Sequence, residues 1–320
     1  MKIKRPDYKI DLKNSSPNQA ISKIFVEIEK IILKEKPDAF IVLGDTNSCL
    51  SAYCAKRYKI PVFHIEAGNR CYDLRVPEEI NRKIIDHISD INLTYSQVAK
   101  QNLLRENIDP DKVFNIGSPL YEVFNCYKKN IFKSNILKKL KLKKNGYFLV
   151  SVHREENIEN NQNFKNFLNF LNFLYQKYKK KIIVSTHPRT MKKVKSLKNF
   201  EKNIIFLKPF SYFDYSKLQI NSKIVFSDSG SISEESSIMG FDAINLRSTN
   251  ERQEAIEYGV VGMSHFDLDI IENLINVENK KYYKEIVNDY KSNNFSKIFL
   301  KILFSYKNYV NEYTWKEKKN

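Results

Sequence analysis

Two short apolar runs, each followed closely by an acidic residue, constrain the fold of this chain most strongly. Residues 39–43 are apolar and lead through one glycine into Asp45, and residues 61–65 are mostly apolar and lead into Glu66. The stretch between them, 47–58, has the length of a helix, so the pattern predicts two parallel strands joined by a crossover. Ligands of open parallel sheets bind beyond the carboxyl ends of the strands. We therefore expect Asp45 and Glu66 side by side at the ligand-binding edge.

A third acidic residue belongs with these two. Pro77 suits the first turn of a helix, and Glu78 and Glu79 follow it, where acidic side chains favour the positive end of the helix dipole. Asp45, Glu66 and Glu78 are therefore candidate catalytic carboxylates. A structural interpretation stays open for each of them: Asp45 as a helix cap, Glu66 as a loop residue and Glu78 as a favourable helix start.

The rest of the chain alternates between helix and strand patterns. Apolar residues at helical spacing predict a helix over 18–34, and a short strand is expected near 8–12. A lysine- and asparagine-rich stretch, 128–145, is interpreted as a linker that carries a short helix. The other expected strands are 91–94, 113–116, 147–151, 181–185, 204–206, 224–227 and 243–246. The other expected helices are 96–106, 163–178, 191–197, 212–219, 232–239, 251–258, 269–276, 280–288 and 295–309.

Two such series in 320 residues predict the α/β class with two Rossmann-like, doubly wound domains. The first domain is expected to span 1–130 and to be joined by a C-terminal helix at 295–320. The second domain is expected to span 131–294.

The charge and the cysteines limit the partners and the compartment. The chain has 54 basic and 37 acidic residues, a net charge of +17, which by itself suggests acidic partners such as a nucleotide diphosphate, nucleic acid or an anionic membrane. The excess is mostly lysine spread along the chain, so we interpret it as compositional drift and expect no nucleic-acid partner. The four cysteines form no CxxC pair and no apolar run approaches the ~18 residues of a membrane span, so a cytoplasmic location is expected.

Two histidine–arginine pairs follow successive strands of the second half. His153-Arg154 comes after the strand at 147–151, and His187 with Arg189 comes after the strand at 181–185. Histidine transfers protons near neutral pH and arginine pairs with phosphate oxygens, so these residues are candidates for a site. A structural role remains the alternative for each histidine.

The segment Ser227-Asp228-Ser229-Gly230-Ser231-Ile232-Ser233-Glu234-Glu235-Ser236 leads from a strand into a helix. The exposed N–H groups at the start of that helix, with the hydroxyls of Ser229 and Ser231, would form an anion site around Gly230. Glu235, one turn further, would accept hydrogen bonds from sugar hydroxyls. The alternative is an ordinary serine cap with acidic residues in the first turn. Another charged segment, 250–254, is interpreted as a solvated helix start.

In this order the motifs GDT, HIEAGNR, PEEINR, SVHREEN, STHPR, SDSG-x-I-x-EES and NERQE resemble the non-hydrolysing UDP-N-acetylglucosamine 2-epimerases. The resemblance covers nearly the whole chain and implies the two-domain glycosyltransferase-B-like fold. The details EAGNRCYDLRVPEE, HISDINLTYS and IGSPLYEV resemble the subgroup that makes UDP-N-acetyl-L-fucosamine from a UDP-6-deoxy-L-talose-type sugar.

The resemblance also implies residue roles. The catalytic residues would be Asp45, Glu66, Glu78 and His153. Arg82 would orient the carboxylates. Ser229, Gly230 and Ser231 match the diphosphate-binding loop, and Glu235 matches the ribose-binding carboxylate. His187 and Arg189 would border the nucleotide, and the backbone near Phe210 would meet uracil.

The implied reaction is elimination of UDP to a 2-acetamidoglycal, followed by re-addition with C2 inverted, for precursors of bacterial surface polysaccharides. It requires no metal or redox cofactor, and the family usually forms homodimers. A glycosyltransferase of the same fold and a non-catalytic UDP-binding protein are the alternatives.

One departure stands out. Family members begin with a strand and a GTRPE-like turn, and this chain starts after that point. We therefore expect an incomplete, N-terminally truncated first domain with weak or no epimerase activity.

Overall fold

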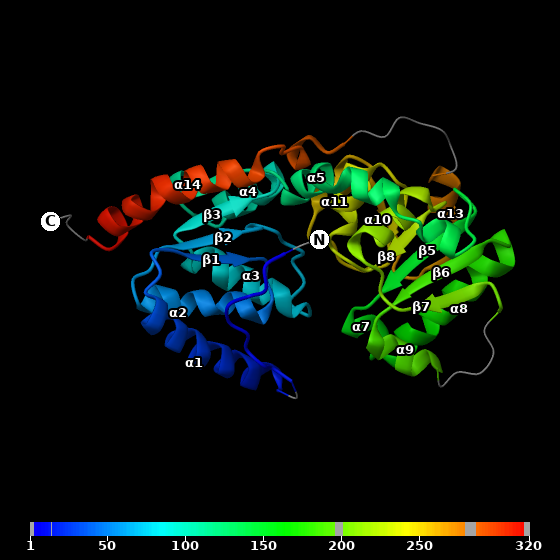
Figure 1. The fold of residues 1–320 in the computed structure, drawn as a ribbon, viewed down its shortest axis with the longest axis horizontal. Coiled ribbons are helices and arrows are strands. Elements are labelled where there is room, and N and C mark those ends of the chain that lie inside the picture. Colours follow the sequence, from blue (N-terminus) through cyan, green and yellow to red (C-terminus); the bar gives the residue numbers. More distant parts are fainter. Residues whose placement is uncertain (1–2, 14, 196–200, 279–285, 317–320) are drawn as a thin grey trace. The chain divides into compact units, whose positions relative to one another are not determined.

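The computed structural model describes residues 3–13, 15–195, 201–278 and 286–316 (Figure 1). The chain forms two compact units, Met1–Pro119 with Ser292–Asn320, and Leu120–Lys291. The division falls at the start of helix α5 (Pro119–Lys133) rather than after residue 130, and the last segment rejoins the first unit.

The first unit contains a parallel sheet in the order β1-β2-β3-β4. Its strands are β1 (Phe40–Leu43), β2 (Val62–Ile65), β3 (Ile91–Thr94) and β4 (Val113–Asn115). β1 pairs with β2 in parallel, with Val42 opposite His64, which confirms the parallel pair predicted from the two apolar runs. The connection between them is η1 (Asn47–Ser51) followed by α2 (Ala52–Arg57).

Local signals in the sequence set the helix boundaries of this unit. Helix α1 (Pro17–Glu35) begins with a capping box, in which Ser16 N donates to Gln19 Oε1 at 2.9 Å and Gln19 N donates to Ser16 Oγ. The short strand expected near 8–12 is wrong, because that segment is irregular and the Tyr8 hydroxyl instead bonds to Glu35 of α1. The other helices are α3 (Pro77–Ile88), α4 (Gln97–Arg105), η2 (Pro110–Lys112), α14 (Phe295–Tyr309) and η4 (Val310–Thr314).

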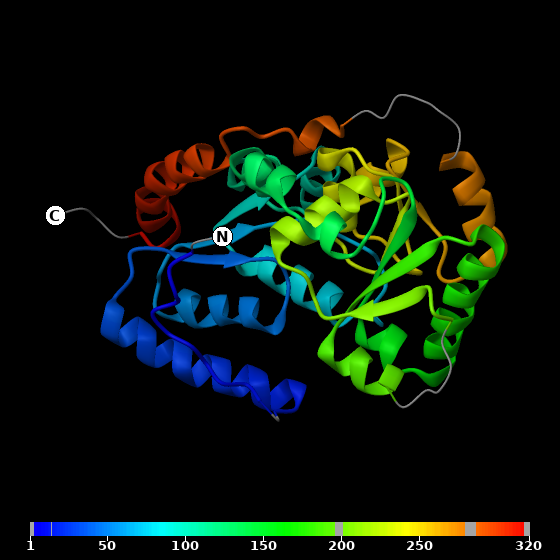
Figure 2. The same cartoon turned by 45° about the vertical axis from the view of Figure 1, so that its right-hand side comes forward.

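Different helices cover the two faces of this sheet. One face packs Val42 and Val62 against α1, α2 and α3, and the other packs Phe63 and Leu93 against α14. Figures 1 and 2 show α1, α2 and α3 on one side of the strands and α14 on the other. In the described part of the chain, the C-terminal helix α14 thus belongs to the first unit.

The second unit contains a parallel sheet in the order β10-β9-β8-β5-β6-β7. Its strands are β5 (Tyr147–Val152), β6 (Lys181–Thr186), β7 (Ile204–Leu207), β8 (Val225–Ser227), β9 (Ala243–Asn245) and β10 (Val261–Met263). The chain winds outward from β5 to β7 and then restarts at β8 on the other side of β5. This reversal confirms a doubly wound sheet. The strand β10 was not predicted, because a three-residue run with a central glycine gives too little pattern.

Helices cover both faces of the second sheet. One face is covered by α8 (Asn161–Tyr178) and α13 (Leu268–Glu278), through residues such as Phe170 and Ile271. The other face is covered by α5, α10 (Tyr212–Asn221) and α11 (Ile232–Met239), through residues such as Ile131 and Leu218. The remaining elements are α6 (Ile136–Lys139), α7 (Glu155–Ile158), α9 (Pro188–Lys195), α12 (Gln253–Glu257) and η3 (Asn288–Tyr290).

Part of the predicted linker is wrong. Residues 128–145 largely belong to α5 and α6, because Ile131 and Ile136 are buried in the second core while the lysines face solvent. Helix α9 begins at Pro188, and residues 196–197 of the predicted helix lie outside the described residues. Of the helix predicted at 280–288, residues 280–285 also lie outside them.

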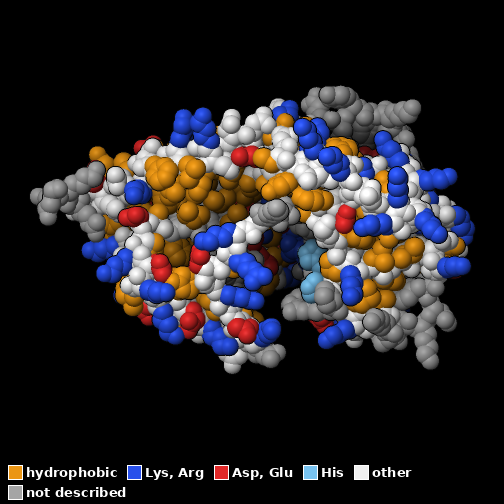
Figure 3. Space-filling view, viewed as in Figure 1, with side chains coloured by type: hydrophobic (Ala, Val, Ile, Leu, Met, Phe, Trp, Pro, Cys, Tyr) orange, Lys and Arg blue, Asp and Glu red, His pale blue; other side chains and the backbone are white. Residues whose placement is uncertain are grey.

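Two surface findings bear on partners. Lysine and arginine side chains are scattered over the face shown in Figure 3, mixed with acidic and apolar ones, so the described residues of that face gather no single basic patch. Within the described part of the chain, the helices are too short or too polar to cross a membrane.

Replacing Phe170 by alanine tests the second core. Phe170 is fully buried, with its ring 5.0 Å from the ring of Phe226, so Phe170→Ala leaves a cavity. We expect the free energy of unfolding, measured by urea denaturation, to fall by about 3–5 kcal/mol. Phe132→Ala, at a position 48 % exposed in the same unit, is the control and should change it by roughly 0.5 kcal/mol. Equal losses would contradict the assignment of this core.

Candidate active site

The carboxyl ends of β1 and β2 bring Asp45 and Glu66 to the same edge of the first sheet. Gly44 turns the chain after β1 with φ of 74°, and its N–H donates to Ile65 O at 3.0 Å. Glu66 has φ of 72°, a left-handed conformation that is uncommon for a residue with a side chain. Its N–H donates to Leu93 O, and a Cβ placed on Gly44 would lie 3.7 Å from Glu66 Oε2. The two turns are therefore neighbours.

Arg82 fixes Asp45. Its Nε and Nη2 lie 2.8 and 2.7 Å from Asp45 Oδ2, and its Nη1 lies 3.0 Å from Glu79 Oε2. The guanidinium is buried between the two carboxylates, so it has little freedom to turn. Asn81 Nδ2 also donates to Asp45 O at 2.8 Å. The start of α3 therefore holds the turn after β1 in place.

The two neighbouring glutamates of α3 have different surroundings. Glu79 is fully buried and accepts hydrogen bonds from Cys71 N and Tyr72 N at 3.0 and 3.1 Å. Burial raises the pKa of Glu79, but the bonds from Cys71, Arg82 and Tyr72 outweigh it and hold the pKa below its usual value. Glu78 is half-buried and makes no side-chain hydrogen bond or ion pair within the described residues. Glu79 therefore supports the loop, whereas Glu78 is available to a ligand.

A buried network behind these turns was missed in the sequence. His64 Nδ1 lies 2.8 Å from Asp86 Oδ1, and His64 Nε2 lies 3.1 Å from Gly44 O. Arg70 Nη1 donates to Asp86 Oδ2 at 2.7 Å, and its Nη2 pairs with Glu106. Burial raises the pKa of Asp86, but His64 and Arg70 lower it further than burial raises it. The available signal was a polar residue, His64, inside an otherwise apolar strand.

In the second unit, the winding direction of the sheet reverses between β5 and β8. Ligands of doubly wound sheets bind where the strand order reverses, beyond the carboxyl ends of the strands. His153 and Arg154 follow β5, and Asp228 follows β8, so all three stand at this point. The topology therefore marks the ends of β5 and β8 as the candidate ligand site of this unit.

Asp228 organises this site, a role that the sequence analysis did not give it. It has no solvent exposure and accepts hydrogen bonds from His153 N at 3.1 Å, Arg154 N at 3.0 Å and Asn157 Nδ2 at 3.0 Å. His153 Nδ1 also lies 3.0 Å from Asp228 Oδ1. The signal available in the sequence was a polar residue directly after each of two strands, His153 after β5 and Asp228 after β8.

The pairing shifts the pKa of both groups. The hydrogen bond to Asp228 raises the pKa of His153, although burial and the charges of Arg154 and Arg247 oppose it. Burial raises the pKa of Asp228, but His153, Asn157 and the Arg154 N–H lower it more. The His153 side chain is 47 % exposed, so an imidazole whose pKa is raised is held at the surface of the site. Such a group binds an anion or donates a proton.

The loop after β8 has the properties of an anion site. The hydroxyls of Ser229 and Ser231 lie 2.9 Å apart, and Ser231 Oγ donates to Glu235 Oε1 at 2.9 Å. Within the described residues, the N–H groups of Gly230 and Ser231 make no hydrogen bond. The alternative of an ordinary serine cap is wrong, because the Ser231 hydroxyl bonds Glu235 instead of capping α11. Unpaired N–H groups at a helix start favour a bound anion.

Comparison with known proteins identifies the family. The family model described as UDP-N-acetylglucosamine 2-epimerase matches residues 1–303 of the chain. The chain belongs to the UDP-N-acetylglucosamine 2-epimerase family. Its members in this comparison are isomerases by name, and the resemblance seen in the motifs is confirmed at this level.

Relatives and solved structures extend the match. An epimerase of Methanocaldococcus jannaschii is 35% identical over 274 residues, which cover 81% of this chain and 73% of that protein. The structure of the Rickettsia bellii UDP-N-acetylglucosamine 2-epimerase has a TM-score of 0.91 and 41% identity, covering 99% of this chain and 86% of that one. The structure of the M. jannaschii epimerase in complex with UDP-GlcNAc and UDP has a TM-score of 0.85 and 33% identity. The match covers 93% of this chain and 85% of that one.

The interpretation of the charged segment 250–254 as a solvated helix start is wrong. Glu251, Arg252 and Glu254 are all buried. Arg252 Nη2 pairs with Glu234 at 2.8 Å, and Tyr290 OH donates to Glu254 Oε1 at 2.7 Å. The segment is therefore part of the core beneath α11, where each charge has a partner.

The other predicted ligand residues follow neighbouring strands. Arg154 Nε donates to Asp228 O at 3.0 Å. His187 follows β6 and is exposed, and Phe210 follows β7 and is half-buried. The side chain of Arg189 lies outside the described residues. Their roles toward a nucleotide stay predictions.

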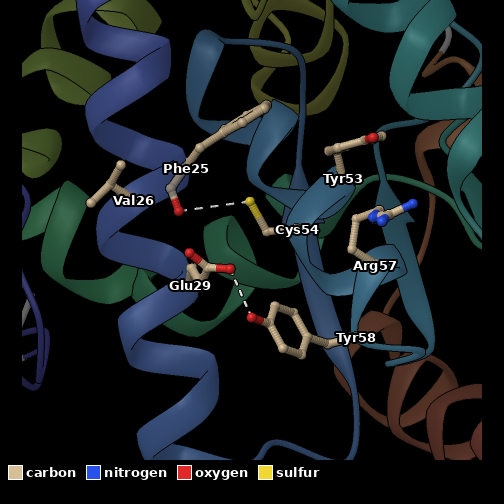
Figure 4. Close-up of a pocket in the computed structure, with 7 residues that line it drawn as sticks. All are labelled: Phe25, Val26, Glu29, Tyr53, Cys54, Arg57 and Tyr58. Carbon is tan, nitrogen blue, oxygen red and sulfur yellow. Dashed lines mark hydrogen bonds between the residues drawn. The ribbon is translucent and has the colours of Figure 1, made fainter.

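A cavity of about 370 Å³ in the first unit is separate from these residues (Figure 4). It lies between α1 and α2, and the rings of Phe25 and Tyr53 stack in it with centroids 5.9 Å apart. It is lined by Phe25, Val26, Glu29, Tyr53, Cys54, Arg57 and Tyr58, none of which belongs to the predicted site. The described residues contain no cluster of side chains suited to hold a metal ion.

Replacing Asp228 by asparagine tests the pairing with His153. The variant removes the negative charge that raises the pKa of His153 and leaves the opposing effects of burial and the two arginines. We expect the pKa of His153 to fall, as measured by NMR titration of its imidazole protons. The imidazole signals of His265 in the same unit, recorded in the same spectra, are the control and should be the same in both chains. An unchanged pKa of His153 would show that the pairing with Asp228 does not raise it.

The same pair makes stability depend on pH in a predictable direction. Because the folded pKa of His153 is raised, its contribution is complete below a pH of about 6.5 and is lost as the pH rises through that raised pKa. Because the pKa of Asp228 is lowered, its contribution is present above a pH of about 3.9 and is lost as the pH falls. We expect the stability difference between the wild type and Asp228→Asn, measured by urea denaturation, to be largest between these limits. A difference that is constant with pH would contradict this.

Proposed function

We propose that this chain binds a UDP-sugar and inverts C2 of its 2-acetamido sugar. The observation that carries the proposal is the pair of strand ends at the reversal of the second sheet. There His153, whose Nδ1 is fixed by Asp228, accompanies the N–H groups after β8 that make no hydrogen bond within the described residues. A diphosphate is the anion that such a site favours. The family and the solved complex of the M. jannaschii relative with UDP-GlcNAc support this choice.

The chemistry requires the leaving group to depart before C2 reacts. The C2 proton of a UDP-sugar is not adjacent to a carbonyl, so its direct removal is very unfavourable. When the C1–O bond to UDP breaks, C1 becomes cationic and the C2 proton becomes acidic. Loss of that proton forms a C1–C2 double bond, which gives a 2-acetamidoglycal and UDP. Protonation of C2 on the opposite face and return of the UDP oxygen to C1 give the epimer.

Each step matches a group of residues. His153 and the loop of Ser229, Gly230 and Ser231 stabilise the negative charge on the departing UDP. The carboxylates Asp45, Glu66 and Glu78 act on the sugar as base and acid. Glu235 accepts hydrogen bonds from the ribose, and Arg154, His187, Arg189 and Phe210 bind the remainder of the nucleotide. Arg82 positions Asp45, to which it is directly bonded.

The substrate is proposed more narrowly from the subgroup motifs. The chain would invert C2 of a UDP-2-acetamido-2,6-dideoxy-L-talose-type sugar to give UDP-N-acetyl-L-fucosamine, a precursor for capsule or O-antigen in bacteria. We also propose a homodimer, which light scattering of the purified chain would test.

The decisive experiment follows solvent deuterium into C2. The chain is incubated in D2O with UDP-GlcNAc and, separately, with the 6-deoxy-L-talose-type UDP-sugar, and the products are examined by NMR. Inverted product carrying deuterium at C2 supports the proposal, and the sugar that reacts faster identifies the substrate. Sugar transfer without deuterium would support a glycosyltransferase, and binding without exchange would support a non-catalytic UDP-binding protein. Either of the last two results would overturn the proposal.

Neutralising a single carboxylate tests the proton-transfer roles. We expect Glu66→Gln and Glu78→Gln each to lower kcat for C2 inversion by roughly 100-fold or more, because loss of a positioned acid or base costs 10²–10⁴-fold. Glu27→Gln, an exposed position on α1 of the same unit, is the matched control and should leave kcat unchanged. UDP binding should survive in all three variants. Full activity of both site variants would contradict the assignment.

A further inference from the structure

Two arginines and two glutamates surround Gly230, the central residue of the loop after β8. Arg247 Nη1 donates to Glu251 Oε2 at 2.5 Å, and these side chains are 0 % and 5 % exposed. Arg252 Nε donates to Gly230 O at 3.2 Å, and its Nη2 pairs with Glu234 of α11. The loop therefore rests on a layer of buried, alternating charges.

Glu251 lies directly against the loop. A Cβ placed on Gly230 would collide with Glu251 Oε1, and the same position lies 3.6 Å from Arg247 Nη1. Only glycine fits here without displacing the carboxylate. The Glu251 carboxylate therefore stands next to the N–H groups that the proposed function gives to a diphosphate.

A carboxylate in this place would repel an anion unless its charge is balanced. Arg247 is the balancing cation, and it is fully buried with Nε and Nη2 lacking any hydrogen-bond partner among the described residues. A buried guanidinium with unpaired donors is unfavourable for folding, which points to a task other than stability. Its charge also reaches the ligand side of the loop, since it is one of the charges that lower the pKa of His153.

We propose that Arg247 is a positioning residue, which neutralises Glu251 beneath the loop of Ser229, Gly230 and Ser231 and so allows that loop to accept a diphosphate. The inference rests on the proposed function, in which this loop binds the diphosphate of a UDP-sugar. It adds a role for the segment 250–254, which supplies the carboxylate that sets the position of Gly230.

The direction in which two substitutions change the Kd for UDP tests the proposal. UDP is titrated into the full-length wild-type chain, Arg247→Met and Glu251→Gln, with isothermal calorimetry as the readout. Arg247→Met leaves an uncompensated carboxylate beside the anion, so we expect at least a tenfold weaker Kd, about 1.4 kcal/mol. Glu251→Gln removes the repulsion, so we expect UDP binding equal to or tighter than that of the wild type. The double variant should return to within about threefold of the wild type, well under that tenfold step.

A role in folding alone predicts a different pattern. Both single substitutions break the same ion pair, so a purely structural pair would weaken UDP binding in both variants, and that result would overturn the proposal. Tyr290→Phe is the control, since it removes the bond to Glu254 in the same cluster without touching Gly230. It should lower the unfolding temperature and leave the Kd for UDP unchanged. If Arg247→Met does not fold, Glu251→Gln decides: weaker UDP binding overturns the proposal and equal or tighter binding supports it.

Inorganic pyrophosphate separates this inference from the proposed function. If the wild-type chain binds pyrophosphate but not UDP, and the two single variants change pyrophosphate binding in opposite directions, the proposed function fails and the role of Arg247 stands. If neither variant changes the binding of UDP or pyrophosphate, the role of Arg247 fails while UDP binding by the wild type stands.

Discussion

The carboxylate of Asp228 is removed from solvent, and this single constraint determines most of the geometry of the second unit's site. A buried carboxylate is stable only if hydrogen bonds and positive charge compensate its lost hydration. Here the donors come from the chain just after β5, a strand that neighbours β8 in the sheet. Satisfying Asp228 therefore fixes the path of the backbone at His153 and Arg154, and with it the direction of the imidazole.

The first unit uses the same device at its own strand ends. Asp86 is buried behind the turn after β1 and is compensated by His64 and Arg70, and Glu79 is buried beneath the loop after β2 and is compensated by Arg82 and backbone N–H groups. Beside the fully buried Glu79, the adjacent Glu78 is half-buried and makes no side-chain hydrogen bond or ion pair within the described residues. Some of the acidic residues in the motifs therefore hold the backbone in place.

Much of the fold could be predicted from the sequence, because buried parallel strands are visible in it as short apolar runs with defined ends. The pattern at 39–66 gave β1, the crossover and β2, and with them the placement of Asp45 and Glu66. β10 was not found, because it is too short for a pattern. The stretch 128–145 was predicted as a linker with only a short helix, because abundant lysine masked the buried face of α5 and α6.

The site was only partly predictable for a different reason. Residues such as His153 and Ser229 belong to motifs at strand ends, so local pattern was enough to select them. Asp228 and Asp86 bond to partners distant in the chain, and their roles depend on which strands become neighbours. The segment 250–254 shows the same limit: its charges looked solvated because the partners that bury them, among them Glu234 and Tyr290, lie elsewhere in the sequence.

The left-handed backbone of Glu66 has a consequence for how this position evolves. Glycine would relax the turn, since a side chain in this conformation is strained by about 1–3 kcal/mol, but glycine carries no acid. Asparagine and aspartate tolerate the conformation better than glutamate, but their shorter side chains place the polar group elsewhere. Substitution of Glu66 by a residue with less backbone strain would therefore not be opposed by the fold. Under the role proposed for Glu66 in proton transfer, persistence of glutamate at this turn would report selection for that role, and its loss would mark a lineage that no longer needs it.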